Sequence, residues 1–167
     1  MRKLIGVCGS DGTDKELSSA TLKTAEEVGY YIAQRDGVLI CGGKGGVMEQ
    51  AAKGAKKGNG LTIGILPGAK EKANRFIDIA IATHLGYARN YILINSADAV
   101  IGIAGRWGTL NEISYSLNIG KPTILIRGSG GWMDILSDET LLKNLDVKPH
   151  IADSAKEAVD LAFKLSQ

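Results

Sequence analysis

Two charged residues of opposite sign stand close to glycine-rich turns and could act on a phosphorylated sugar. Glu112 lies a few residues after the segment AGRWGT, and its carboxylate could bind a ribose hydroxyl or act as an acid or base. It also has capping-box spacing from Thr109, and this purely structural interpretation is the better supported of the two. Arg89 comes just before an apolar stretch and could bind an anion through two parallel hydrogen bonds, or be an ordinary surface charge. Its position in a loop after a strand favours the anion.

Glycine-rich turns provide a second kind of candidate site, one built from backbone. Glycine lets N–H groups turn inward at the start of a helix, where unpaired donors and the helix dipole favour an anion. The segment CGGKGGV, residues 41–47, passes through four glycines into a helical pattern, but it is neither a dinucleotide fingerprint nor a Walker loop. The turn at residues 8–14 has the same character, as does the turn that holds Gly105, Arg106 and Gly108. A tight strand-to-helix turn without a ligand is the alternative for each.

These turns need a sheet to bring them together, and the rest of the sequence predicts one. Continuous apolar runs, typical of strands buried on both faces of a parallel sheet, cover residues 4–8, 38–41, 61–66, 77–82, 99–103 and 123–126. Helical patterns lie between several of them, the longest at about 15–34, with another after Gly108. A last helix is expected to begin at Ser154, which has capping-box spacing from Glu157.

The alternation of strands and helices predicts the fold class. We expect a single Rossmann-like, doubly wound α/β domain over residues 1–167, with a mostly parallel sheet of about six or seven strands and helices on both faces. In such folds ligands bind outside the carboxyl ends of the strands, which is where the glycine-rich turns lie.

Composition and charge narrow the classes of function. The 167 residues are 44% hydrophobic and 23% charged, as in an ordinary globular domain, and no apolar run approaches the roughly 20 residues that a membrane span needs. The first apolar stretch is too short for a signal peptide, so we expect a cytoplasmic protein. A net charge of +2 and an aromatic content of 5% argue against nucleic acid as a partner.

The cysteines and histidines give little support to metal chemistry. Cys8 and Cys41 each end an apolar run and lack the spacing of metal ligands, so we expect both to be buried free thiols. The chain has two histidines, His84 and His150, and no His/Cys cluster can be assembled from these residues. The sequence therefore predicts no metal site.

Six short motifs in fixed order resemble one known group of proteins. They are GGKGGVM at 42–48, GILPG at 64–68, LGYARN at 85–90, NSADAVIGIAG at 95–105, GTLNE at 108–112 and GKP at 120–122. Together they are similar to the LOG-like superfamily, long labelled "lysine decarboxylase", which is related to the Rossmann-like domain of the DNA-processing protein A family. Within it, the sequence most resembles the branch of molybdenum cofactor carrier proteins and their uncharacterised relatives. The resemblance covers about residues 3–127.

The resemblance implies a Rossmann-like sheet, a phosphate or nucleotide pocket, and a homodimer or homotetramer. The phosphoribohydrolase branch splits cytokinin-type nucleoside 5′-monophosphates into base and ribose 5-phosphate, and its motif glutamate and arginine correspond to Glu112 and Arg89. Departures from that branch fall at the pocket, since Ala104 replaces a proline, Arg106 a glycine and Asn90 a lysine. These departures favour the carrier-like branch over hydrolysis.

Two functions therefore stay open. The first is a carrier-type binding protein for a phosphorylated small molecule, either a nucleotide or a molybdenum cofactor-like pterin phosphate, that requires no cofactor of its own. The alternative is a phosphoribohydrolase that cleaves the N-glycosidic bond of a nucleoside 5′-monophosphate with Glu112 and Arg89 as catalytic residues. Binding of single-stranded DNA is the weakest interpretation. The residues expected to bind the ligand are Gly9, Ser10, Gly42, Gly43, Lys44, Gly45, Gly46, Arg89, Asn90, Gly105, Arg106, Trp107, Gly108, Thr109 and Glu112.

Overall fold

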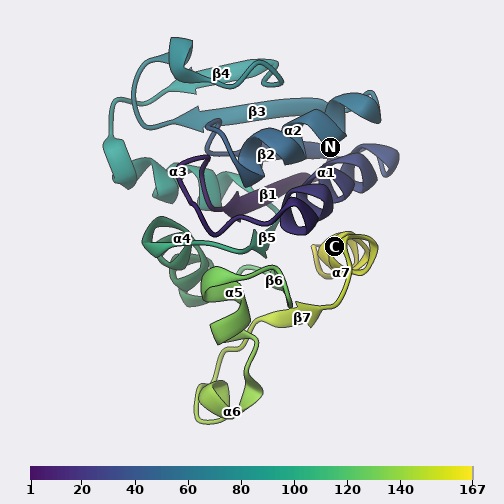
Figure 1. The fold of residues 1–167 in the computed structure, drawn as a ribbon, viewed down its shortest axis with the longest axis vertical. Coiled ribbons are helices and arrows are strands. Elements are labelled where there is room, and N and C mark those ends of the chain that lie inside the picture. Colours follow the sequence, from purple (N-terminus) through teal and green to yellow (C-terminus); the bar gives the residue numbers. More distant parts are fainter. Residues whose placement is uncertain (167) are drawn as a thin grey trace.

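A seven-stranded parallel sheet runs through the computed structural model, in which residues 1–166 are described. Its strands are β1 (Leu4–Gly9), β2 (Val38–Cys41), β3 (Leu61–Leu66), β4 (Ile79–Ala82), β5 (Ala99–Ile103), β6 (Thr123–Ile126) and β7 (His150–Ala152). They stand in the order β4-β3-β2-β1-β5-β6-β7 (Figure 1). The chain winds outward from β1 to β4, then returns to the other side of β1 and winds outward again. This confirms the predicted doubly wound α/β fold.

Helices cover both faces of the sheet. They are α1 (Ser19–Gln34), α2 (Val47–Lys57), α3 (Arg89–Ser96), α4 (Trp107–Asn118), α5 (Gly131–Leu136), α6 (Glu139–Leu142) and α7 (Ala155–Leu165). Apolar residues of α1, α2 and α7 join one core cluster, whereas those of α3, α4 and α5 join a second. Within residues 1–166, no helix is both long and apolar enough to span a lipid bilayer.

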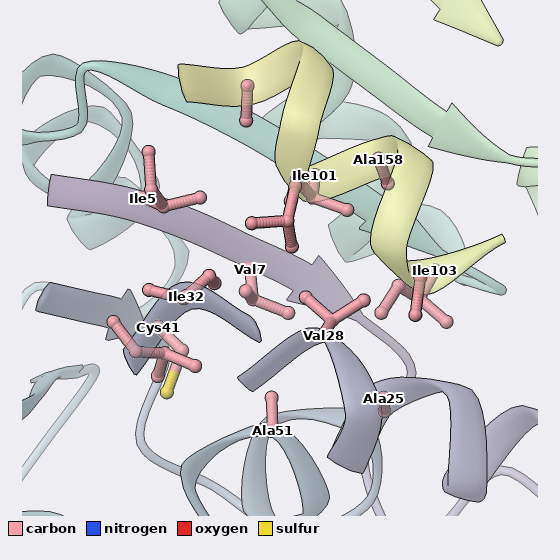
Figure 2. Close-up of a cluster of buried hydrophobic side chains, with 14 of the residues drawn as sticks. Ile5, Val7, Ala25, Val28, Ile32, Cys41, Ala51, Ile101, Ile103 and Ala158 are labelled. Atoms are coloured by element: carbon pink, nitrogen blue, oxygen red, sulfur yellow. The ribbon is translucent and has the colours of Figure 1, made fainter. Parts of the chain in front are cut away.

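The two clusters lie on opposite faces because side chains alternate along each strand. Ile5 and Val7 of β1 point to the first face, where they meet Val28 and Ile32 of α1 (Figure 2). Cys8, the next residue, belongs to the second cluster. Both cysteines are buried and free, as predicted.

Helices α1 and α2 are in backbone contact on the first face. A Cβ atom at Gly29 of α1 would overlap the carbonyl oxygen of Ala51, and one at Gly54 of α2 would overlap that of Glu26. Only glycine permits so close a crossing, because any other residue would push the two helices apart. The helices that follow the first two glycine-rich turns are thus packed against each other.

Several predicted boundaries are corrected by the structure. The first helix begins at Ser19 rather than near residue 15, because Ser18 adopts an extended backbone and its hydroxyl accepts a hydrogen bond from the Thr21 N–H (3.0 Å). The strand predicted at 77–82 begins at Ile79. The Ser154 cap is confirmed by its bond from the Glu157 N–H (3.2 Å), although the Glu157 carboxylate accepts from Asp153 rather than from Ser154.

Candidate functional site

The carboxyl ends of β1 and β5 mark the point at which the winding of the sheet reverses. Ligands of doubly wound folds bind in the crevice at this position. A cavity of about 470 Å³ lies there, within the usual range for small-molecule sites. Predicted residues that line it are Gly9, Ser10, Lys44, Arg89, Asn90, Arg106, Trp107, Gly108, Thr109 and Glu112. Most of the residues proposed from sequence are thus brought to one place.

The predicted glycines that do not line the cavity join the loops around it. Gly42, Gly43, Gly45, Gly46 and Gly105 make up this group. A Cβ at Gly42 would overlap the guanidinium of Arg89, and a Cβ at Gly46, whose φ is 69°, would overlap the carbonyl oxygen of Ser10. The first N–H group of α2, at Val47, donates to the same Ser10 oxygen (3.0 Å). The turn between β2 and α2 therefore packs closely against Arg89 and Ser10, which is a structural role, and its contact with a ligand stays a prediction.

The turn after β5 is held by two serine hydroxyls. Ser10 Oγ accepts from the Gly105 N–H (3.0 Å), and Ser129 Oγ accepts from the Ala104 N–H (2.8 Å). Ser129 was missed at the sequence level because it stands in the loop after β6, far from the other motifs in the chain. These two amides are therefore committed to the protein and are not free to bind a ligand.

Helix α4 begins at the cavity without a side-chain cap. Its N-cap is Arg106, whose side chain makes no capping bond, and Trp107, Gly108 and Thr109 form its first turn. The N–H groups of a first helical turn have no partner within the helix, and the helix dipole adds positive potential there. Because these residues line the cavity, the site combines backbone donors with the exposed charge of Arg106.

The capping-box interpretation of Glu112 is wrong. The positive φ values of Ala104 (54°) and Gly105 (106°) turn the chain so that α4 begins at Trp107, two residues before Thr109. Thr109 is therefore inside the helix and its amide is not at the N-cap. Glu112 lies in the second turn, where its carboxylate accepts a hydrogen bond from Nη1 of Arg89 (2.9 Å).

This ion pair forms the floor of the cavity and is almost completely buried. The side chains of Arg89 and Glu112 are 9% and 8% exposed. Burial raises the pKa of Glu112 above its ordinary value, and the charge of Arg89 offsets part of that rise. Burial likewise raises the pKa of the Cys8 thiol well above its usual range, and that of Cys41 to about 11. Both thiols are thus neutral near pH 7, which makes them poor nucleophiles.

Two buried polar atoms in residues that line the cavity have no hydrogen-bond partner within the described part of the chain. They are Nε of Arg89 and Oδ1 of Asn90. The amide nitrogen of Asn90 donates to Oδ1 of Asn111 (2.8 Å), so only half of that side chain is satisfied. Unpaired buried polar atoms cost free energy, and native proteins tend to keep them at functional sites.

The rim of the cavity is built from exposed side chains. Nζ of Lys44 lies 3.1 Å from Oδ2 of Asp11, which links the turn after β2 to the turn after β1. Hydrogen bonds from Thr13, and the neighbouring Lys44 charge, lower the pKa of Asp11 to about 2. Trp107 is 73% exposed, and its ring lies 5.0 Å from that of Trp132. Asp11 was not among the site residues predicted from the sequence, although it stands beside the predicted Ser10.

A larger and more apolar hollow of about 870 Å³ adjoins this cavity. It runs between α3 and α4, and the rings of Tyr91 and Tyr115 lie 5.2 Å apart in its wall. Tyr87 and Trp107 line both hollows. The polar cavity and the apolar hollow therefore share part of their lining.

A family model and two sequence relatives match most of this chain. The sequence model of the SLOG cluster4 family matches residues 2–159. An uncharacterised protein of Archaeoglobus fulgidus is 46% identical over 130 residues, which are 74% of this chain and 83% of that protein. A cytokinin riboside 5′-monophosphate phosphoribohydrolase of Mycobacterium tuberculosis is 28% identical over 89% of both chains.

Several solved structures match this chain over nearly its whole length. The molybdenum cofactor binding protein of Rippkaea orientalis is 37% identical, with a TM-score of 0.89 over 100% of this chain and 99% of that chain. The molybdenum cofactor carrier protein of Chlamydomonas reinhardtii is 31% identical, with a TM-score of 0.82 over 99% and 98% of the two chains. DNA processing protein A of Streptococcus pneumoniae, 19% identical with a TM-score of 0.71 over 95% of this chain and 61% of its own, shares the fold.

Proposed function

The chain belongs to the SLOG cluster4 family, and from this membership we propose that it is a carrier-type binding protein for a phosphorylated small molecule. The ligand is a nucleotide or a molybdenum cofactor-like pterin phosphate, held at the carboxyl edge of the sheet by a cytoplasmic protein. The similarity to proteins described as binding or carrying molybdenum cofactor supports this proposal. The predicted site residues that line the cavity are its proposed ligand contacts.

One observation carries the proposal: the cavity brings cationic side chains together with an uncapped helix start. Lys44, Arg89 and Arg106 all line it, and so does the first turn of α4. Guanidinium groups and free backbone N–H groups are the donors that proteins use for phosphate. Arg106 is exposed and makes no ion pair within residues 1–166, so its full charge is free for an anion.

Calorimetric titration tests the proposal. We expect at least one of AMP, GMP, ribose 5-phosphate and a molybdenum cofactor preparation to give a saturable heat of binding. Arg106→Gln should weaken that binding, whereas Arg2→Gln is the matched control, because Arg2 pairs with Asp36 at the opposite edge of the sheet (2.7 Å). The absence of saturable binding by every ligand in the panel would contradict the proposal.

The alternative function is hydrolysis of a nucleoside 5′-monophosphate. It is supported by the similarity to the phosphoribohydrolase of Mycobacterium tuberculosis and by the position of Glu112 in the cavity. In this reaction water adds across the N-glycosidic bond and yields the free base and ribose 5-phosphate. The Glu112 carboxylate would stabilise positive charge on the sugar or orient the water, with Arg89 on the phosphate. The hydrogen bond from Nη1 of Arg89 to Oε1 of Glu112 opposes that arrangement, because it already commits one atom of each side chain.

Product analysis separates hydrolysis from binding. Incubation of AMP with the protein should release adenine if the alternative is correct, and Glu112→Gln should abolish the release. A rate that Glu112→Gln leaves unchanged would exclude this carboxylate from the mechanism. No free base, together with saturable binding of AMP, is the result expected of a carrier.

We propose further that the protein is a homodimer or homotetramer assembled through α3 and α4. Tyr91 is 61% exposed on α3, and Ile119, which follows α4, is 41% exposed. Large aromatic and aliphatic groups exposed together are typical of subunit interfaces. Light scattering should give a multiple of the 17.6 kDa chain mass. Tyr91→Glu should reduce that mass, and Tyr30→Glu on α1 should not.

A further inference from the structure

Trp107 is the largest side chain that the cavity leaves in solvent. It is the first residue of α4 and is 73% exposed. An exposed indole gains nothing from burial, and the core clusters of the described residues do not include it. The packing of the fold therefore gives no reason for a tryptophan at this position.

The exposed ring of Trp107 is nevertheless held in place. Trp132, at the start of α5, lies 5.0 Å from it with an interplanar angle of 58°. Trp132 is half-buried, and its backbone N–H donates to the carbonyl oxygen of Gly105 (3.0 Å). This bond ties the start of α5 to the turn from which α4 starts, and each helix presents one indole to the other. A rigid exposed aromatic ring costs little entropy when it binds a ligand.

The surroundings of Trp107 indicate what such a ligand carries. On one side stand the cationic groups of the polar cavity, with Arg106 as the preceding residue. On the other side begins the apolar hollow, whose wall Trp107 shares with Tyr87. The Tyr87 ring packs beside Gly108, where an added Cβ would lie 3.5 Å from it. A molecule with its anion in the cavity would therefore place its adjoining group against aromatic rings.

We propose that Trp107 is the platform on which a planar heteroaromatic ring of the phosphorylated ligand stacks, and that it makes the site specific for phosphoesters that carry such a ring. This inference rests on the proposed binding function and adds to it a residue and a chemical requirement. Stacking suits a purine or a pterin equally, because both offer a flat π-face. A bare sugar phosphate offers none.

The test compares ligands with and without a ring on matched variants. AMP and GMP are titrated against ribose 5-phosphate by calorimetry, with wild type, Trp107→Ala, Trp107→Phe and the control Tyr30→Ala. Wild type should bind the better nucleotide roughly tenfold or more tightly than ribose 5-phosphate, since stacking on an aromatic ring contributes this much. Trp107→Ala should remove that advantage and leave ribose 5-phosphate unchanged. Trp107→Phe should retain most of it, and Tyr30→Ala all of it.

Fluorescence and light scattering complete the experiment. Nucleotide should quench the emission of wild type more than that of Trp107→Phe, in which Trp132 is the remaining tryptophan. Equal affinity of wild type for ribose 5-phosphate and both nucleotides would overturn the stacking role while leaving phosphate binding intact. A failure of all three ligands to bind would overturn the proposed function itself. A smaller assembly for Trp107→Ala, with unchanged nucleotide affinity, would assign the ring to a subunit contact and overturn the inference.

Discussion

The floor and the rim of the cavity differ in how their charges are balanced. The floor, defined as Arg89 and Glu112, is buried, and its two charges form an ion pair at 2.9 Å. The rim, defined as Asp11, Lys44, Arg106 and Trp107, is in contact with solvent. A buried charge that loses its partner is costly, whereas an exposed charge is stabilised by water in any case. Substitutions at the floor should thus mainly lower the free energy of unfolding, whereas substitutions at the rim should mainly lower the affinity for the ligand.

Removal of one floor charge should have the largest effect. We expect Arg89→Met to lower the free energy of unfolding by about 3–5 kcal/mol, because Glu112 is left buried and unpaired. The double variant Arg89→Met with Glu112→Leu should lose less than Arg89→Met alone. Urea denaturation monitored by circular dichroism measures both, with Arg2→Met as the exposed control. A double variant less stable than Arg89→Met would show that an unpaired Glu112 charge is not the cause of the lost stability.

The carboxylates of the floor and rim should respond to pH in opposite directions. The pKa of Glu112 is raised by burial, so its contribution to stability is complete below its ordinary value of about 4.5 and is lost as the pH rises through the raised pKa. Asp11 has a pKa lowered to about 2, and its contribution is present above about 3.8 and lost as the pH falls towards 2.

Unfolding measured from pH 3 to pH 8 in wild type and Glu112→Gln checks this difference. Relative to Glu112→Gln, wild type should lose stability as the pH rises above about 4.5. The comparison of wild type with Asp11→Asn should show the reverse dependence, confined to the acid end. Parallel curves for wild type and Glu112→Gln would mean that the buried carboxylate does not change its charge in this range.

At the rim, Arg106→Gln should leave stability within about 0.5 kcal/mol of wild type, as is usual for exposed positions. The affinity for AMP should fall by roughly tenfold, the effect of losing one charge-assisted hydrogen bond. Calorimetry and urea denaturation on the same preparation give both numbers. A large loss of stability would remove the distinction between floor and rim.

The smallest effect is expected for Asp11→Asn. This change releases Lys44 from its ion pair, so the affinity for phosphate should rise about twofold, while stability at pH 7 changes by no more than about 1 kcal/mol. Lys44→Gln should instead lower the affinity. An equal loss of affinity in both variants would indicate that the ion pair itself shapes the rim.

Most of the sheet could be predicted from the sequence because its strands are buried on both faces. Runs such as 38–41 and 99–103 are continuously apolar, and the structure has strands at the same residues. Strand β7 was missed because it has three residues and begins with the exposed His150. The buried thiols were also predicted correctly, since Cys8 ends an apolar run.

The sequence predicted that most of the candidate residues would lie near one crevice, but not how they pair with each other. In a doubly wound fold, ligands bind outside the carboxyl ends of the strands, and this rule places Arg89 and Glu112 near the same crevice. The contact between Arg89 and Glu112 depends on the residue at which α4 begins. That starting residue depends in turn on the positive φ values of Ala104 and Gly105, which cannot be predicted from the pattern of side chains. A capping box and a helix interior have identical spacing in a sequence. A contact between residues far apart in the chain, such as the hydrogen bond from Ala104 to Ser129, likewise leaves no pattern in the local sequence.

The glycine crossing of α1 and α2 has a mechanical consequence for the cavity. Gly29 and Gly54 bring the two backbones together so closely that neither helix can slide or roll without the other. The turns that lead into these helices, with Asp11 and Lys44, therefore belong to one stationary wall. A ligand in the cavity therefore meets, on that side, a wall whose outline is set by the packing of two helix backbones.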